Sequence, residues 1–198
     1  MHPLQYGWTF YAHYESESNN YGSSYETLGT FDTVEDFWRL FNNIPNVNVL
    51  TSREKAIITN SHTVIAFSMF KNNIKPEWEE IENKNGSEWS CRQEISDNDI
   101  EYLWRNMCLD CIGGNIDVIG IRVVNKNNPY KNMSKLELWM SKIQDPVQVY
   151  TEFSSSFRGL EGILQNDIPV FTLLYHDNKK DDYNSAYMKR KKKHKNLW

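Results

Sequence analysis

The sequence predicts an α+β domain built from one antiparallel sheet with helices packed on one face. Segments rich in β-branched and aromatic residues outnumber the helical segments, hairpin signals recur, and the helical segments are spaced apart along the chain. A length of 198 residues suits one domain with a sizeable core rather than two. We find no internal repeat, and we assign residues 1–176 to the domain and 177–198 to a polar, basic and flexible C-terminal segment.

The first predicted elements are a strand, a loop and a helix. Trp8–Tyr14 is a run of aromatic and β-forming residues, which is typical of a strand. Residues 15–24 are polar and predict a loop with Tyr21 at its tip. Thr33 then starts a helix in a pattern that resembles a capping box. The apolar residues of this helix recur at helical spacing, and they are Val34, Phe37, Trp38 and Phe41.

The middle of the chain predicts two further strands. Residues 43–61 are polar and irregular, and the sequence assigns them no element. Thr63–Phe70 predicts a strand with one mostly buried face. Asn83–Gly86 predicts a hairpin turn, because Asn-Gly tolerates the positive φ values of a tight turn, and Glu88–Arg92 is the outgoing strand.

A second helix gives the strongest helical signal. Ser96 or Asp97 caps its start, and Gly113-Gly114 ends it. Cys108 and Cys111 form a CxxC pair, but no second pair or paired histidines complete four metal ligands, and both thiols fall on the apolar stripe. We therefore predict thiols buried in the core. The stripe comprises Ile100, Leu103, Trp104, Met107, Cys108 and Cys111.

Two more strands follow the second helix. Residues 118–124 are rich in β-branched side chains and predict a central strand. A loop that opens at Asn125 reaches Lys131 and Lys135. Residues 136–139 then alternate back into a strand.

A third helix and a last strand complete the predicted domain. Asp145 and Pro146 suit the N-cap and the first helical position, and the helix ends at Gly159 or Gly162. Residues 168–174 predict the last strand.

Charge divides the chain into an acidic body and a basic tail. The formal charge is −4, but the run Lys189–Lys195 holds six of the 22 basic residues and leaves 16 basic against 26 acidic residues elsewhere. Such a body does not hold bulk nucleic acid by counterion release, so any nucleic-acid role must be local. The run fits a solvated tail, a transient contact with a nucleic-acid backbone, or a nuclear-import signal.

Three cysteines without a disulfide framework point to a reducing compartment. No apolar run approaches the length of a membrane span. We therefore expect a cytoplasmic protein that does not contact membranes, and the basic run leaves a nuclear location open as well.

A tryptophan and a carboxylate stand side by side in the segment Ile74–Glu79. Pro76 fixes its own φ and biases the preceding residue to extended geometry, so this segment predicts a loop. Trp78 can offer its face to a flat ligand, and Glu79 can accept two parallel N–H bonds such as those at the edge of guanine. Taken alone, these residues also fit a packed tryptophan beside a solvated acid. The chain's seven Trp and eleven Tyr favour a stacking site.

The sequence carries no motif of the common enzyme classes. We find no Gly-rich phosphate loop, no GxSxG and no HExxH. His176-Asp177 is an adjacent pair, whereas a catalytic triad needs three converging groups. We therefore predict a binding protein with no catalytic residues, no metal and no cofactor.

Several stretches, in order, resemble the translation initiation factor 4E family, which binds the 7-methylguanosine cap of messenger RNA. Six of the seven tryptophans fall on positions that this family fills with tryptophan, and the likeness runs from His2 to about His176. Ordered motif spacing is far more specific than any one piece. The stretches are His2-Pro3-Leu4-Gln5 before Trp8, Phe31 to Trp38, Pro76 to Glu79, Trp89, Trp104 to Leu109, and Leu138-Trp139.

This resemblance implies a curved antiparallel sheet with three helices on its convex face and a cap slot on the concave side. Trp78 and Tyr21 would stack on the two faces of the base, although most members of the main class carry tryptophan in place of Tyr21. Glu79 would read the guanine edge, and Trp139 would contact the methyl group. Methylation makes the base cationic, so each aromatic face adds about 0.5–2 kcal/mol of cation–π attraction.

The resemblance also implies a phosphate site and a partner site. Lys126, where the family has an arginine, and Lys135, which matches a family lysine, would neutralise the cap triphosphate. On the other side of the domain, the family receives a helical Tyr-x4-Leu-φ peptide from a scaffold initiation factor or an inhibitory binding protein. The matching positions here are His2, Pro3, Val34, Trp38 and Leu109.

Some alternatives stay open. Asn106 replaces an acidic residue of the partner site, and Trp38 fits core packing as well as partner contact. The leading hypothesis is a monomeric cap-binding initiation factor. A cap-binding repressor that does not recruit the scaffold is the second, because Tyr11 and Tyr21 resemble a divergent class of the family. An interaction protein that has lost cap binding is the third.

Overall fold

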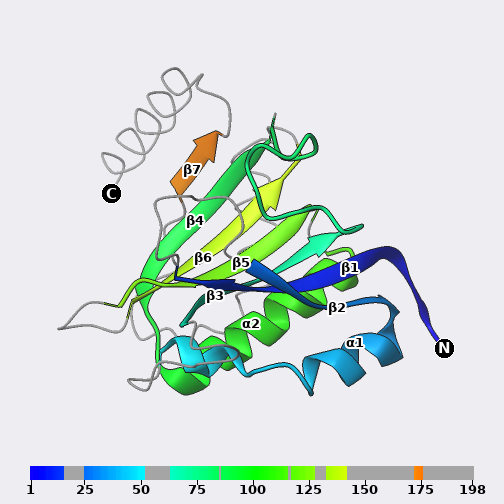
Figure 1. Cartoon of the computed structure of the whole chain (residues 1–198), viewed down its shortest axis with the longest axis horizontal. Helices are drawn as coiled ribbons and strands as arrows, with labels where there is room; N and C mark the ends of the chain where they lie inside the picture. The colour runs from blue at the N-terminus through cyan, green and yellow to red at the C-terminus, as the bar shows by residue number, and fades with distance from the viewer. Residues whose placement is uncertain are drawn as a thin grey trace, which may run out of the picture.

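The computed structural model describes residues 1–15, 25–51, 63–84, 86–115, 117–127, 133–141 and 172–175. These residues form one curved seven-stranded sheet in the order β2-β1-β3-β5-β6-β4-β7, with every neighbouring pair antiparallel. Both α-helices lie on the same side of the sheet (Figure 1). The predicted α+β class with an antiparallel sheet is therefore confirmed.

The strands and helices have the following bounds. The strands are β1 Pro3–Tyr14, β2 Tyr25–Thr33, β3 Val64–Lys71, β4 Ser87–Glu94, β5 Gly120–Asn125, β6 Met133–Met140 and β7 Thr172–Tyr175. The helices are α1 Val34–Phe41, the short 3-10 helix η1 Val47–Leu50, and α2 Asp97–Ile112. Within the described part of the chain, none of the helices is long and apolar enough to cross a bilayer.

The predicted helix boundaries are confirmed at both α-helices. The Thr33 hydroxyl accepts a hydrogen bond from the Asp36 backbone N–H at 3.1 Å, and Ser96 does the same for Asp99 at 3.2 Å. These side chains satisfy N–H groups that have no partner inside the first turn. Gly113 caps the end of α2, and Gly114 has φ +73°, a conformation that favours glycine.

Two expectations from the sequence need correction, and two segments that it left unassigned form elements. The sequence assigned no strand to residues 25–32, which form most of β2. This strand lies at the edge of the sheet, and eight of its nine residues are half-buried or exposed, so it carries no apolar alternation. The hairpin at Asn83–Gly86 is wrong, since β4 pairs with β6 and β7 and not with the chain before the turn. Lys135 lies inside β6 and not in the preceding loop. The unassigned segment after α1 contains η1.

Some expectations lie outside the described residues. These are the loop tip with Tyr21, the third helix from Asp145, Lys131 and the basic run Lys189–Lys195.

The main core lies between the sheet and the helices. Successive residues of a strand point to opposite faces, so Phe10 of β1, Phe67 of β3 and Leu138 of β6 turn toward the helices. The predicted stripes of both helices meet them: Phe37 of α1 and Leu103 of α2 have no exposed surface. Burying side chains of this size contributes about 1.5–3 kcal/mol each, and this core therefore fixes which face of the sheet remains for binding.

The opposite face of the sheet is partly polar. Its apolar members form a smaller cluster of Tyr11, Phe70, Ile119 and Trp139. The buried polar side chains on this face belong to β1, β3, β4 and β6, and they include His13, Ser68, Glu88, Ser90 and Glu137. A sheet face that buries charged side chains is expected where a site is built and not where a core is packed.

Candidate functional site

Trp78 lies on the turn between β3 and β4 and is 47% exposed. Its ring centroid is 6.3 Å from that of Trp139, with the planes at 55°. By contrast, Trp8, Trp89 and Trp104 are at most 3% exposed and belong to the core on the helix side. The prediction that Trp78 sits on a loop with an accessible face is confirmed.

The backbone of the Trp78 turn is held by one buried side chain. Asn83 has no exposed surface, and its amide nitrogen donates hydrogen bonds to the carbonyl oxygens of Lys75 at 2.9 Å and Glu77 at 2.6 Å. These two carbonyls flank Pro76, so the side chain closes the turn just before Trp78. Such side chain to backbone bonds order a turn that lacks ladder bonds of its own.

Two tyrosines tie the same turn to the first two strands. The Tyr25 hydroxyl of β2 donates to Glu77 Oε1 at 2.5 Å, and the Tyr11 hydroxyl of β1 donates to the Ile74 carbonyl at 3.2 Å. Their rings meet edge-on, with centroids 5.6 Å apart. Burial and the Glu77 carboxylate raise the pKa of Tyr25, so this hydroxyl keeps its proton and donates at any physiological pH. The side chains of Asn83, Tyr25 and Tyr11 thus order the turn that carries Trp78.

Glu79 and Trp139, the other described residues predicted to contact the base, differ in how far their side chains are exposed. Glu79 is exposed and follows Trp78 directly. Trp139 is 1% exposed, and its ring contacts both Trp78, at 6.3 Å between centroids, and Phe70, which it meets edge-on at 5.4 Å. The buried Trp139 ring thus provides a packing contact for the exposed Trp78 ring. Its contact with a methyl group stays a prediction, as does the second aromatic face from Tyr21.

Lys135 lies between two buried carboxylates. Its Nζ is 2.6 Å from Glu88 Oε1 on β4 and 2.7 Å from Glu137 Oε1 on β6. The Glu88 and Glu137 side chains are 1% and 4% exposed, and that of Lys135 is 15% exposed. Arg122 of β5 adds a longer contact, 3.7 Å from its Nη1 to Glu137 Oε2. We call Lys135, Glu88, Glu137 and Arg122 the charge cluster.

The charge cluster adjoins the Trp78 site through Trp139. The indole N–H of Trp139 donates to Glu137 Oε2 at 3.2 Å, so one carboxylate contacts both the aromatic support and the cluster. Burial and the neighbouring Glu137 charge raise the pKa of Glu88, although Lys135 opposes this. Burial lowers the pKa of Lys135, but Glu137 and Glu88 outweigh it and the net pKa is raised. Lys135 therefore stays charged.

Lys126, the second predicted phosphate ligand, follows β5 and has an exposed side chain. Its backbone N–H donates to the Met133 carbonyl at 2.7 Å, which closes the base of the loop between β5 and β6. Asn127 anchors the same loop, because its amide nitrogen donates to the Leu50 carbonyl of η1 at 3.2 Å. Partial desolvation lowers the pKa of Lys126, the Glu137 charge opposes this, and the charges of Arg92, Lys135 and Arg122 lower the pKa further.

The predicted partner residues of the N-terminus converge at the start of α1. The Val34 backbone N–H donates to the His2 carbonyl at 2.9 Å, and Pro3 pairs with Thr33. The Glu35 carboxylate accepts from the His2 backbone N–H at 2.8 Å and lies 2.8 Å from His2 Nδ1. These bonds from His2 lower the pKa of Glu35 to about 2. The structure thus brings His2, Pro3 and Val34 together.

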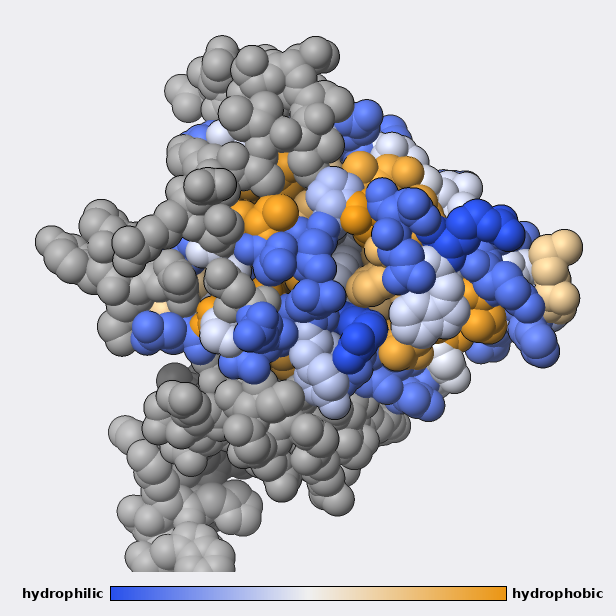
Figure 2. Space-filling view, turned by 90° about the horizontal axis from the view of Figure 1, so that it is seen from below, coloured by the Kyte–Doolittle hydropathy of each residue, from blue (hydrophilic) through white to orange (hydrophobic). Residues whose placement is uncertain are grey.

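Trp38 and Leu109, the other two predicted partner residues, lie half-buried on the two helices. The Trp38 ring packs edge-on against Phe37 at 4.9 Å and Phe41 at 6.0 Å, so part of it belongs to the core. Figure 2 looks onto the helix side and shows apolar patches between polar side chains. Trp38 therefore packs in part against the core, and its contact with a partner stays a prediction.

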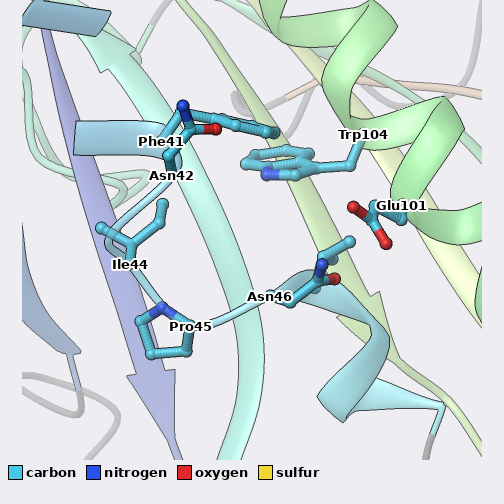
Figure 3. Close-up of a pocket in the computed structure, with 8 residues that line it drawn as sticks. Phe41, Asn42, Ile44, Pro45, Asn46, Glu101 and Trp104 are labelled. Carbon is cyan, nitrogen blue, oxygen red and sulfur yellow. The ribbon is translucent and has the colours of Figure 1, made fainter. Parts of the chain in front are cut away.

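A hollow of about 260 Å³ opens on this side, where the end of α1 meets η1 and α2. Aromatic and aliphatic side chains form its walls, and Glu101 and two asparagines stand at it (Figure 3). The sequence did not predict it, because its lining comes from segments that are far apart in the chain. The lining residues are Phe41, Asn42, Ile44, Pro45, Asn46, Val47, Glu101 and Trp104.

The cysteine pair of α2 is part of the core, as predicted. Cys108 and Cys111 are free thiols with at most 3% exposure. Burial raises the pKa of both thiols, which suppresses the thiolate that metal binding and redox chemistry need.

Sequence reasoning missed Asn83, Glu88 and Glu137 as parts of the site. A signal for Glu137 was present, because a carboxylate between Leu136 and Leu138 interrupts an apolar strand at a position that faces away from the core. Asn83 gave no such signal, since its amide meets the turn only after the chain folds back.

Comparison with known proteins places this chain in a family. The family model described as Eukaryotic initiation factor 4E matches residues 3–194. Eukaryotic translation initiation factor 4E of Dictyostelium discoideum is 30% identical over 151 residues, which are 73% of this chain and 54% of that protein. Factor 4E-2 of Schizosaccharomyces pombe is 26% identical over 164 residues, 82% of this chain and 63% of that protein. The chain thus spans only about half to two thirds of the length of these relatives.

Solved structures show the same fold. Ascaris suum eIF4E-3 in complex with an m2,2,7G cap has a TM-score of 0.66 and 22% identity, with 91% of this chain and 94% of that chain covered. C. elegans eIF4E-3 with the 4E-binding protein Mextli and a cap analogue has a TM-score of 0.65 and 20% identity, with 88% and 92% covered. Schistosome eIF4E with m7GpppG and 4E-BP has a TM-score of 0.62 and 24% identity, with 87% and 88% covered. With the family model matched over nearly the whole sequence, this chain belongs to the eukaryotic initiation factor 4E family.

Proposed function

We propose that this chain binds the 7-methylguanosine cap of messenger RNA, without catalysis, and recruits the mRNA for translation initiation through a scaffold partner. The observation that carries the proposal is the exposed Trp78, held on an ordered turn directly before Glu79, in a chain of the initiation factor 4E family. The nematode and schistosome structures with this fold hold cap analogues.

The physics of the site suits a cationic purine. Stacking of a base on an aromatic side chain is worth about 1–3 kcal/mol. A positive charge on the base adds about 0.5–2 kcal/mol for each face. Trp78 supplies one face, and we propose Tyr21 for the other and Trp139 for the methyl contact. Glu79 then accepts the two N–H groups at the guanine edge in charge-assisted hydrogen bonds of about 1.5–3 kcal/mol each.

We assign the cap phosphates to Lys126 and Lys135. Both lysines flank the strand turn between β5 and β6, on the face that carries Trp139. Lys126 has the more exposed side chain of the two, so it is the stronger candidate for direct phosphate contact.

The partner proposal rests on the helix side. His2, Pro3 and Val34 form one end of a surface on which Trp38 and Leu109 are half-buried. We propose that a helical Tyr-x4-Leu-φ peptide of a scaffold factor or an inhibitory binding protein packs there. Two of the solved complexes contain 4E-binding proteins, which supports this partner class.

A repressor that binds the cap without recruiting the scaffold is the second candidate. Tyr11, one of the two residues that suggested it, has a local role here, because its hydroxyl holds the Trp78 turn. Titration of a synthetic Tyr-x4-Leu-φ peptide into the protein by calorimetry separates the two functions. Binding supports the partner site and its absence supports the repressor.

Tryptophan fluorescence tests cap binding directly. We expect 7-methylguanosine triphosphate to quench the protein's emission, and unmethylated GTP to bind at least about tenfold more weakly, since it lacks the cationic attraction to the aromatic faces. Trp78→Phe should abolish most of the quenching. Trp38→Phe on the helix side is the matched control and should keep it. Absence of quenching by the methylated ligand eliminates the proposal and leaves an interaction protein that uses the helix side.

A further inference from the structure

The charge cluster places two carboxylates where the proposed function needs positive charge. Lys135 is the residue that would meet the cap phosphates, yet its ammonium lies 2.6 Å from Glu88 and 2.7 Å from Glu137. This inference rests on the proposed function, because it concerns the phosphate end of the same site.

We infer that Glu88 and Glu137 are specificity-determining residues that hold Lys135 in an internal ion pair and thereby limit what the cap phosphates contribute to binding. The site then selects mainly for the methylated base, and it gains little as phosphates are added.

The first argument is the number of hydrogen-bond donors. A lysine ammonium has three N–H donors. Two of them are directed to Glu88 Oε1 and Glu137 Oε1, so Lys135 has at most one left for a phosphate oxygen. The Lys135 side chain is only 15% exposed, which restricts that donor further.

The second argument is the balance of charge. Lys135 and Arg122 face Glu88 and Glu137, so the cluster has no net positive charge when all four are ionised. Carboxylates that are nearly buried repel an approaching phosphate through a medium that screens poorly. Lys126, at the edge of the cluster, then has to supply most of the attraction for a triphosphate.

The third argument is that the carboxylates are fixed. Glu137 Oε2 accepts from the Trp139 indole N–H at 3.2 Å, and Glu88 is 1% exposed on the neighbouring strand. Neither side chain can swing into solvent without leaving a buried charge or donor unpaired, which is costly. The carboxylates therefore remain beside Lys135 while a ligand binds at Trp78.

The experiment compares three ligands: 7-methylguanosine, its 5′-monophosphate and its 5′-triphosphate, titrated by tryptophan fluorescence into the full chain. For the wild type we expect less than about tenfold tighter binding of the triphosphate than of the monophosphate. Glu137→Gln keeps an oxygen for Trp139 and removes one charge. It should tighten triphosphate binding by roughly tenfold and change nucleoside binding by less than about twofold.

Two further variants and a salt titration of the wild type make the test independent of Glu137→Gln alone. Glu88→Gln should act in the same direction as Glu137→Gln. Glu101→Gln on the helix side is the matched control and should change none of the three affinities by more than about twofold. Because few net charges meet the phosphates, the affinity of the wild type for the triphosphate should fall only weakly with salt.

The possible outcomes distinguish a failure of this inference from a failure of the proposed cap binding. A gain above about tenfold from monophosphate to triphosphate in the wild type overturns the inference and leaves cap binding intact. Equal changes for all three ligands in Glu137→Gln indicate a purely structural ion pair and overturn it as well. Failure of all three ligands to bind overturns the proposed function, and the inference with it.

Discussion

Asn83 should control both the stability of the Trp78 turn and the affinity for the cap. Its amide nitrogen makes two hydrogen bonds, to Lys75 and Glu77, inside a fully buried site. A net value of about 0.5–1.5 kcal/mol for each bond gives a loss of roughly 1–3 kcal/mol for Asn83→Ala. For a chain of this size, each kcal/mol lowers the melting temperature by about 2–4 °C.

A second substitution, Asn83→Asp, tests whether the amide N–H donor of Asn83 stabilises the turn. Asn83→Asp keeps the shape of the side chain but replaces the donor with an acceptor, which would face two carbonyl oxygens at neutral pH. It should therefore destabilise the protein more than Asn83→Ala does. Asn98→Ala, at an exposed position in the first turn of α2, is the matched control and should stay within about 0.5 kcal/mol of the wild type.

Urea unfolding and cap titration measure these effects together. We expect Asn83→Ala to weaken binding of 7-methylguanosine triphosphate by roughly tenfold. A turn that lacks these two hydrogen bonds has more conformational entropy, and it loses this entropy when the base stacks on Trp78. If Asn83→Ala unfolded like the wild type, or if Asn83→Asp were the milder change, the turn would not depend on these two hydrogen bonds.

Three other outcomes are expected. Tyr21→Trp should tighten cap binding, because the larger ring offers more face to the cationic base; unchanged or weaker binding in a fluorescence titration would contradict the assigned sandwich. His13 is 4% exposed and pairs with Ser68 at 2.8 Å, and burial followed by the Arg122 charge holds its pKa well below the ordinary value of 6.5. The unfolded chain therefore binds a proton first, so stability should fall as the pH drops below about 6.5, and His13→Gln should flatten that part of the urea-midpoint profile. His2→Ala should raise the pKa of Glu35 from about 2 only partway toward 4.5, since the backbone N–H of residue 2 still donates to the carboxylate. An NMR titration of the Glu35 carboxyl measures this pKa, and an unchanged value would show that the His2 ring does not lower it.

The sequence by itself determined the elements whose signals are local. The Thr33 and Ser96 hydroxyls cap the helices through residues three positions on, and the stripes that contain Phe37 and Leu103 repeat within single helices. The loop position of Trp78 also follows from a neighbouring proline. Each of these features depends on residues a few positions apart, so the chain need not be folded for them to be inferred.

Only the tertiary structure decided how the site is supported. Tyr25 and Tyr11 reach the Trp78 turn from β2 and β1, and Asn83 reaches it by folding back from the end of the same connection. The edge strand β2 carries no apolar alternation that would reveal it in the sequence. The pairing of Lys135 with Glu88 joins residues 47 positions apart and depends on β4 lying beside β6. A lysine that looks like a phosphate ligand in the sequence becomes an ion-pair partner because strand pairing, and not spacing along the chain, sets which charges meet.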